Sequence, residues 1–282
     1  MLLGARDLPR LSGCAQRLIE ILNSPQPVVA DVAEVLARPD AGDLSSPVLR
    51  LANSSPYGLR TRVTSLSHAV ALLGFRTTRS AVLAAAIAEL FRTPPRSPCM
   101  NMPAFALHGM ASAVVARRLS RYAGIGDPEV SYTLGLVHDL GKLVLDQCYP
   151  DDYLRAVTFA RRSPQPSWKS ERAVLAYDHA AVGNAIAHIY KLPDDVAAAV
   201  GRHHDPKAPL ESDLSLVEHV AAHVCWVKNY RCHDEYVPPE LNDTAWRRLH
   251  LDARAMEHLL GALDVEVQSA CEMFLPDRPA VV

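Results

Sequence analysis

The hydrophobic positions of this chain recur with the period of an α-helix along almost its whole length. Between Leu66 and Leu73 apolar residues are spaced i, i+3, i+4 and i+7, which places them on one helical face. The alanine-rich stretch 80–91 continues as another buried helix. Runs that alternate polar and apolar residues between tight turns are absent from the sequence. The pattern therefore predicts an all-α protein with about a dozen helices.

Capping residues indicate where two of these helices begin. Residues 127–129 (Asp-Pro-Glu) combine an N-cap acid, a proline in the first helical position and a first-turn acid. They precede a long helical segment that is predicted to run to about Cys148. Residues 192–195 (Leu-Pro-Asp-Asp) open another helix with similar chemistry.

Prolines divide the helical pattern. Three of them fall in residues 92–98, where they remove backbone donors and clash with any preceding helical turn. We therefore expect a boundary there, with residues 1–93 forming an N-terminal helical bundle. Residues 94–282 would then form a second helical domain with C-terminal helices.

Composition excludes several classes of protein. With 282 residues, 49% of them hydrophobic and 21% charged, the chain can bury a sizeable core and is neither disordered nor fibrous. The net charge of −2 provides no overall field for nucleic acid or membranes. One stretch, 44–88, lacks acidic residues but contains five arginines. They form either a basic face for an anionic partner or solvated surface charges, and the second interpretation is preferred. These arginines are Arg50, Arg60, Arg62, Arg76 and Arg79.

The sequence also indicates a cellular compartment. No uncharged apolar run reaches the ~18–20 residues that span a bilayer, and the first residues lack the apolar core of a secretory signal. Six cysteines are scattered without a C-x-x-C pair, as expected for reduced structural thiols. We expect a cytoplasmic protein without membrane contact.

Twelve histidines are the part of the composition that most needs an explanation. His138 and Asp139 are adjacent within an apolar segment, where both are costly to bury unless their polar atoms are satisfied. An imidazole nitrogen beside a carboxylate oxygen suits a divalent metal ion. Gly135 and Gly141 flank the pair and would allow another helix or a ligand to approach closely.

Other histidines are predicted to point into the same interior. His108 shares a helical stripe with apolar residues, His179 shares a face with Leu175 and later apolar positions, and His203 and His204 end their helix. A single inward histidine is usually a hydrogen-bonded core residue. Histidines from four separate helices, together with an aspartate, instead favour a shared metal site.

The order of these residues resembles the HD superfamily of metal-dependent phosphohydrolases, and more closely its HDOD branch, the HD-related output domain. The resemblance covers about residues 8–230. It implies an N-terminal helical bundle packed on a C-terminal HD-like domain, and a role in bacterial signalling, where HDOD proteins are generally regarded as non-catalytic. The segments that carry it are 49–58, 65–74, 135–145, 178–184, Leu192-Pro193 and the pair His203-His204.

The resemblance also implies a set of ligands for one or two divalent ions, either iron, manganese or zinc. In an enzyme of this kind, Lys142 would neutralise a substrate phosphate. The implied metal ligands are His108, His138, Asp139, His179, His203 and His204.

The chain also departs from the HD pattern. A further ligating aspartate on a later helix is replaced by Ala222, which has no donor atom. His219 and His223 lie on one helical face nearby and are candidate substitutes. The Gly-Tyr-Pro motif of the cyclic-di-GMP phosphodiesterase branch is missing after His204.

Three functions remain open from the sequence. The favoured one is a non-catalytic signalling or scaffolding module with a degenerate HD-type pocket, which interacts with other signalling proteins and could hold an anionic ligand or nucleotide. The alternative is a metal-dependent phosphohydrolase acting on a nucleotide or cyclic dinucleotide. A nucleic-acid binder that uses the arginine-rich face is the least favoured. The tryptophans, Trp168 among them, are interpreted as packing residues.

Overall fold

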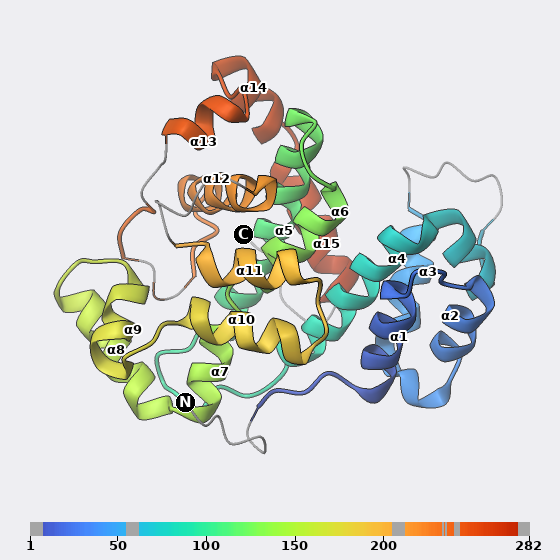
Figure 1. Ribbon diagram of the computed structural model, residues 1–282, viewed down its shortest axis with the longest axis horizontal. Coiled ribbons are helices and arrows are strands. Elements are labelled where there is room, and N and C mark those ends of the chain that lie inside the picture. Colours follow the sequence, from blue (N-terminus) through green and yellow to red (C-terminus); the bar gives the residue numbers. More distant parts are fainter. Residues whose placement is uncertain are drawn as a thin grey trace.

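The protein is described here by a computed structural model, which places residues 8–54, 62–204, 212–232, 234, 236–239 and 243–275. All regular secondary structure in these residues is helical, which confirms the all-α prediction (Figure 1). The helices of the first part of the chain are α1 (Gly13–Asn23), α2 (Val29–Leu36), the 3-10 helix η1 (Pro39–Leu44), α3 (Ser45–Ala52) and α4 (Leu66–Leu90).

Eleven further α-helices follow in the part of the chain that the structure describes. They are α5 (Met102–Ala123), α6 (Pro128–Val137), α7 (Leu140–Cys148), α8 (Pro150–Arg162), α9 (Ser167–Leu175), α10 (His179–Ile189), α11 (Asp194–Arg202), α12 (Asp213–Val227), α13 (Asp243–Arg248), α14 (Ala253–Leu260) and α15 (Leu263–Phe274). Figure 1 shows α10, α11 and α12 stacked beside α5; α11 packs against both α10 and α12, and α12 packs against α5.

The predicted helix from Asp127 to Cys148 is wrong in one respect, because it is two helices. Asp127 caps α6 as expected, its side chain accepting a hydrogen bond from the backbone N–H of Glu129. The chain then breaks at His138 and Asp139 before α7 begins. Successive side chains of an uninterrupted helix point about 100° apart. The break allows both polar side chains to face the same interior.

Helix α4 contains a break at Gly74, whose φ of 73° and ψ of 166° are outside the helical range. This divides the apolar stretch at 66–73 from the alanine-rich one, as the sequence predicted. Among the described helices, α4 alone has the length and apolar composition of a membrane span, yet most of that stretch is buried inside the protein.

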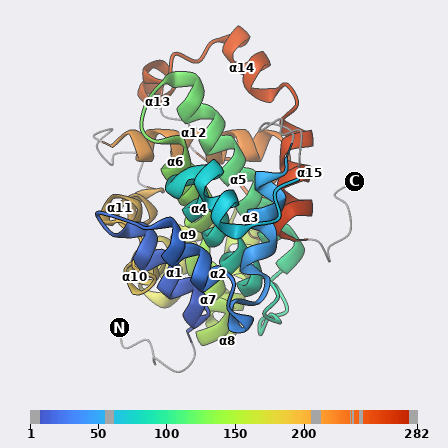
Figure 2. The same ribbon diagram turned by 90° about the vertical axis from the view of Figure 1, so that its right-hand side faces the viewer.

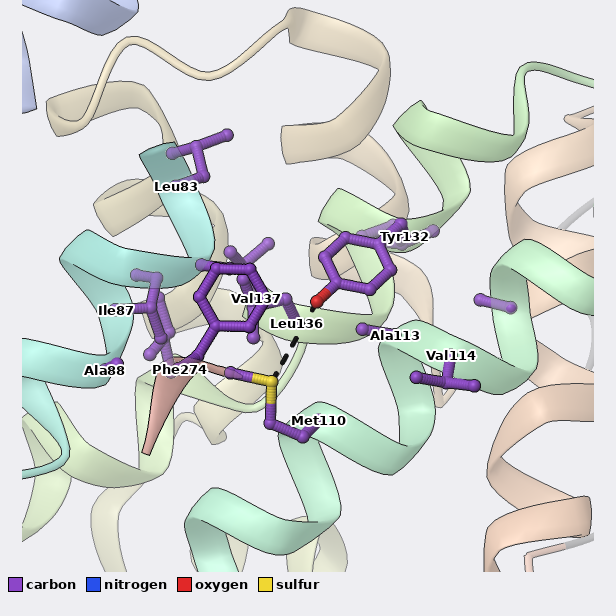
Figure 3. Packing of buried hydrophobic residues seen from close by; sticks show 14 of the residues in the cluster. Leu83, Ile87, Ala88, Met110, Ala113, Val114, Tyr132, Leu136, Val137 and Phe274 are labelled. Atoms are coloured by element: carbon purple, nitrogen blue, oxygen red, sulfur yellow. Dashed lines mark hydrogen bonds between the residues drawn. The ribbon is translucent and has the colours of Figure 1, made fainter. Parts of the chain in front are cut away.

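The centre of the core is built from α4, α5, α6 and α15 (Figure 3). Ile87 of α4, Met110 of α5 and Phe274 of α15 are buried in this part of the core, and Tyr132 of α6 points its hydroxyl at the Met110 sulfur, 3.9 Å away. Burial raises the pKa of Tyr132 to about 12. This apolar packing holds α5 against α6 along their length, so it fixes the positions of His108 and His138.

Two glycines allow the helices of the site to approach each other closely. A Cβ on Gly135 would lie 2.6 Å from the backbone of Ser112 in α5. A Cβ on Gly141 would lie 1.9 Å from the carbonyl oxygen of His179 in α10. Both distances are far below van der Waals contact, so only glycine permits this approach of α6 to α5 and of α7 to α10.

The boundary predicted near Pro94–Pro98 stays a prediction. Helix α4 packs against α1, α2 and α3 and also against α6, and α15 reaches back to α3, as Figure 2 shows from the side. The proline-rich segment itself is attached to α7, because the Asp146 carboxylate accepts the backbone N–H groups of Arg96 and Ser97 at 2.9 and 2.8 Å.

Three of the five arginines of the predicted basic face, Arg50, Arg76 and Arg79, have side-chain partners in the structure. Arg76 forms an ion pair with Asp127 at 2.6 Å, Arg79 donates to Asn23 at 3.1 Å, and Arg50 donates to Ser46 at 3.0 Å. Arg60 lies outside the described residues. Of these three contacts, the ion pair with Asp127 balances a positive charge, whereas Asn23 and Ser46 are neutral partners.

Candidate metal centre

The structure brings the six implied metal ligands together into two groups that share one carboxylate. Within each group, one nitrogen or oxygen atom from every residue lies within 4.8 Å of the others. We call them the α10–α11 group and the α5–α6 group. The α10–α11 group consists of Asp139, His179, His203 and His204, and the α5–α6 group of His108, His138 and Asp139.

The six residues lie within, between and at the ends of several helices. His108 lies within α5, and His138 and Asp139 occupy the break between α6 and α7. His179 is the first residue of α10, so it does not share a helix with Leu175, as the sequence pattern suggested; Leu175 ends α9. His203 caps the C-terminal end of α11. The site therefore depends on how five helices pack together.

Four of the histidines have their Nδ1 atom held by an acceptor. A carbonyl or carboxylate oxygen accepts but does not donate, so each Nδ1 carries a proton and each Nε2 is left to face the interior. The contacts are His108 to Tyr230 O (2.7 Å), His138 to Gly135 O (2.8 Å), His203 to Val200 O (2.7 Å) and His179 to the Glu171 carboxylate (2.6 Å).

The Nε2 atoms converge in pairs. Those of His108 and His138 are 3.1 Å apart, and those of His179 and His204 are 2.6 Å apart. Two nitrogen lone pairs facing each other repel unless a proton or a metal cation lies between them. The Nε2 of His203 and both carboxylate oxygens of Asp139 are buried without a hydrogen bond of good geometry. Imidazole nitrogens with one carboxylate form a donor set that fits a divalent metal ion.

The electrostatics of the site favour an ionised Asp139 beside a neutral His138 and a neutral His204. Burial would raise the pKa of Asp139, but Lys142 and His138 hold it well below its usual value. Burial lowers the pKa of His138 and of His204. Burial opposes protonation of His179 too, yet Glu171 and Asp139 raise its pKa to about 10. His179 is therefore protonated on Nε2 as well as on Nδ1, and the Nε2 proton lies between the His179 and His204 nitrogens, which are 2.6 Å apart.

Lys142 lies behind the cluster rather than in the adjacent pocket. Its side chain is 1% exposed, and its Nζ is 2.8 Å from Asp139 Oδ2 and 3.0 Å from Asp234 Oδ1. A lysine in this position neutralises the carboxylate of Asp139. The implied contact with a substrate phosphate is not provided by this arrangement.

A pocket opens directly at the cluster, with a cavity of about 160 Å³. His219 and Ala222 of α12 form part of its wall, whereas His223 does not line it, and neither histidine joins the two groups. The remaining lining residues are His138, Asp139, Pro166, Ser167, Trp168, Lys169, His203, His204, Tyr236, Val237, Pro238 and Pro239.

The interpretation of Trp168 as a packing residue is corrected by its place in this pocket. Its ring is stacked on that of His204, with the centroids 6.1 Å apart and the planes 18° from parallel. The guanidinium of Arg172 lies 4.9 Å from the Trp168 centroid. The Trp168 ring therefore packs against His204, one of the candidate metal ligands, and restrains the orientation of its imidazole.

Sequence reasoning missed three buried acids around the site: Glu171, Glu218 and Asp234. Glu171 accepts from His179, and Asp234 pairs with Lys142. Glu218 accepts from Ser112 Oγ at 3.1 Å, and its Oε1 is 3.5 Å from His138 Nδ1. The one available indication was that Glu218 lies four residues before Ala222, which places both on one helical face.

Glu218 makes the stability of the protein depend on pH. Burial raises the pKa of Glu218 from 4.5 to about 8, so the folded state binds its proton more tightly than the unfolded state does. Stability from this group is complete below the lower value and declines as the pH rises towards the higher one. Glu218→Gln keeps the shape without the titration. We expect the free energy of unfolding of Glu218→Gln, relative to that of the wild type, to rise by up to about 1.4 kcal/mol per pH unit in this range.

Urea unfolding of both proteins from about pH 5 to about pH 8 measures this difference. Glu34→Gln, on the exposed face of α2, is the surface control. A gap between wild type and Glu218→Gln that stays constant with pH would contradict the buried, protonated state of Glu218.

Comparison with known proteins identifies a family model and several similar structures. A model described as the HDOD domain matches residues 8–206. The crystal structure of an HDOD domain protein of unknown function from Geobacter sulfurreducens superimposes with a TM-score of 0.78 at 22% identity, covering 95% of this chain and 94% of that one. A candidate phosphohydrolase from Shewanella amazonensis gives a TM-score of 0.71 at 22% identity, covering 95% of each chain.

Two further relatives extend the comparison. A candidate signal transduction protein from Marinobacter aquaeolei gives a TM-score of 0.72 at 20% identity, covering 94% of this chain and 60% of that one. An uncharacterised protein of Treponema pallidum is 23% identical over 206 residues, which are 73% of this chain and 39% of the relative. This chain thus matches well under half of that relative's length. At these identities the structural matches establish the fold.

Proposed function

Because this chain belongs to the HDOD domain family, we propose that it is a non-catalytic, cytoplasmic signalling module whose HD-type pocket binds a metal ion without turnover. Its partner would be another signalling protein, and its pocket would accept a small anionic ligand or nucleotide beside the cluster. The description of the similar Marinobacter protein as a candidate signal transduction protein supports the signalling role.

Ala222 is the observation that carries this proposal. It lies in the wall of the pocket, at the position where the HD pattern has a ligating aspartate, and it offers no donor atom. Asp139 is then the one carboxylate in the two groups of described residues, and Lys142 already lies 2.8 Å from it. A site with so little net negative charge binds and balances divalent ions less well than one with two free carboxylates.

The residues that would hold metal are those of the two groups. A bound divalent ion would supply Lewis-acid chemistry and a more acidic water molecule. The chain itself contributes histidines whose Nδ1 atoms are already held by carbonyl or carboxylate acceptors, and a Trp168 ring that restrains His204. This fixed arrangement suits binding, and it does not replace the missing carboxylate.

A metal-dependent phosphohydrolase acting on a nucleotide or cyclic dinucleotide is the second candidate function. It is favoured by one observation, the presence of all six implied ligands around a pocket that opens at them. The similar candidate phosphohydrolase from Shewanella amazonensis supports the same reading.

Metal analysis and activity assays decide between these two functions. We expect the purified protein, supplied with manganese or iron, to hydrolyse phosphomonoesters, nucleotides and cyclic dinucleotides no faster than the metal salt alone. Ala222→Asp restores the carboxylate to the pocket wall and is assayed in parallel. Turnover by the wild-type protein that scales with enzyme concentration and stops on chelation would overturn the non-catalytic proposal.

A further inference from the structure

Glu171 of α9 makes an unusually complete set of contacts with His179. Its Oε2 accepts the backbone N–H of His179 at 2.7 Å, and its two oxygens lie 2.9 and 2.6 Å from the ring Nδ1. Both side chains are at most 1% exposed. The ring is thereby held with its Nε2 2.6 Å from His204 Nε2 and 3.2 Å from Asp139 Oδ1.

Glu171 differs in charge from the acceptors of the other histidines. His108, His138 and His203 each donate Nδ1–H to a neutral backbone carbonyl, whereas His179 donates to a carboxylate. A carboxylate draws the Nδ1 proton more strongly, which increases electron density at Nε2 and makes the ring a better metal ligand. The α10–α11 group contains this histidine. In the α5–α6 group the Glu218 carboxyl lies 3.5 Å from His138 Nδ1, which donates instead to the Gly135 carbonyl oxygen at 2.8 Å.

Helix α9 supports a second member of the same group. Trp168 lies three residues before Glu171, on the same helical face, and stacks on the His204 ring. One helix therefore restrains both His179 and His204. A restrained ligand loses less conformational freedom when it binds, which also favours this group.

We propose that Glu171 is a positioning residue for metal binding, and that it causes the α10–α11 group to take up a divalent ion before the α5–α6 group does. This rests on the metal-binding pocket of the proposed function and adds an order of filling. The two groups compete for Asp139, so the group with the stronger nitrogen donor fills first.

Calorimetric titration of the metal-free, full-length protein with Mn²⁺ tests the order. We expect Glu171→Gln to weaken the first binding event by about 10- to 100-fold, the range typical for loss of such a carboxylate. His179→Ala should abolish the first event, whereas His108→Ala should leave it in place. Glu218→Gln is the control at a buried acid outside the α10–α11 group, and should change the first dissociation constant by less than about threefold.

Circular dichroism melting shows whether each variant folds. If Glu171→Gln is unfolded, Glu171→Asp is titrated instead, because it keeps the charge but withdraws it from the ring. Three results would each overturn the proposal. The first is an affinity of the first event that does not change on substitution of Glu171, and the second is loss of the first event in His108→Ala but not in His179→Ala. The third is no Mn²⁺ binding by the wild type. Turnover by the wild type would overturn the non-catalytic role and leave the order of filling intact.

Discussion

Replacement of Lys142 by methionine is expected to lower the free energy of unfolding by about 3–5 kcal/mol. The Lys142 ammonium is buried between two carboxylates, 2.8 Å from Asp139 and 3.0 Å from Asp234. Methionine fills a similar volume but carries no charge, so two buried carboxylates lose their counter-ion. The cost of a buried charge without its partner, rather than lost packing, accounts for the effect.

Urea unfolding of wild type, Lys142→Met, Asp234→Asn and the double variant measures this effect as a double-mutant cycle. The double variant should be more stable than Lys142→Met alone, because the negative charge of Asp234 is then removed together with the positive charge of Lys142. Added Mn²⁺ should stabilise Lys142→Met more than the wild type, since a cation beside Asp139 replaces the lost charge. If Lys142→Met unfolds within about 1 kcal/mol of the wild type, the buried ion pairs contribute far less than the geometry indicates.

Substitution of Gly141 by alanine is expected to cost at least about 3 kcal/mol or to prevent folding. The added Cβ would lie 1.9 Å from the carbonyl oxygen of His179, 2.7 Å from its carbonyl carbon and 2.9 Å from the backbone nitrogen of Gly183. All three atoms belong to the backbone of α10, so no side-chain rotation relieves the overlap. Helix α10 would have to move away from α7, taking His179 with it.

Gly13 provides the matched control for this substitution. It lies at the start of α1, and a Cβ there meets no atom within 4 Å. Alanine at Gly13 should leave stability unchanged or raise it by up to about 1 kcal/mol, because alanine favours the helix. Thermal and urea unfolding compare the two variants. A Gly141→Ala protein as stable as Gly13→Ala would show that α7 and α10 are less closely packed than described.

The elements that sequence analysis predicted well are those set by neighbours along the chain. The caps at Asp127 and the start of α11 at Asp194 lie where propensity and apolar spacing indicated. The break between α6 and α7 escaped prediction, because apolar residues continue on both sides of His138 and Asp139. Their turn is stabilised by Lys142 and by histidines from distant helices, and such contacts leave no trace in local spacing.

The six implied ligands illustrate the same division. Their identities followed from the order of histidines and one aspartate along the chain, and the structure places their donor atoms in two groups. That His179 donates to Glu171, and that Trp168 stacks on His204, required the packing of α9 against the cluster. The identity of a glutamate or tryptophan in the sequence does not reveal whether it lies in the core, in a pocket or on the surface.

The sequence by itself determined that the chain is helical, which faces are apolar and which residues carry donor atoms for a metal, because each is a property of residue type and local spacing. Only the tertiary structure decided where the charged side chains lie and which partners they have. Lys142 neutralises Asp139 instead of facing the pocket, and Glu171 is buried against His179. The reason is physical: the free energy of a buried charge depends on its distance to partners that lie far away in sequence.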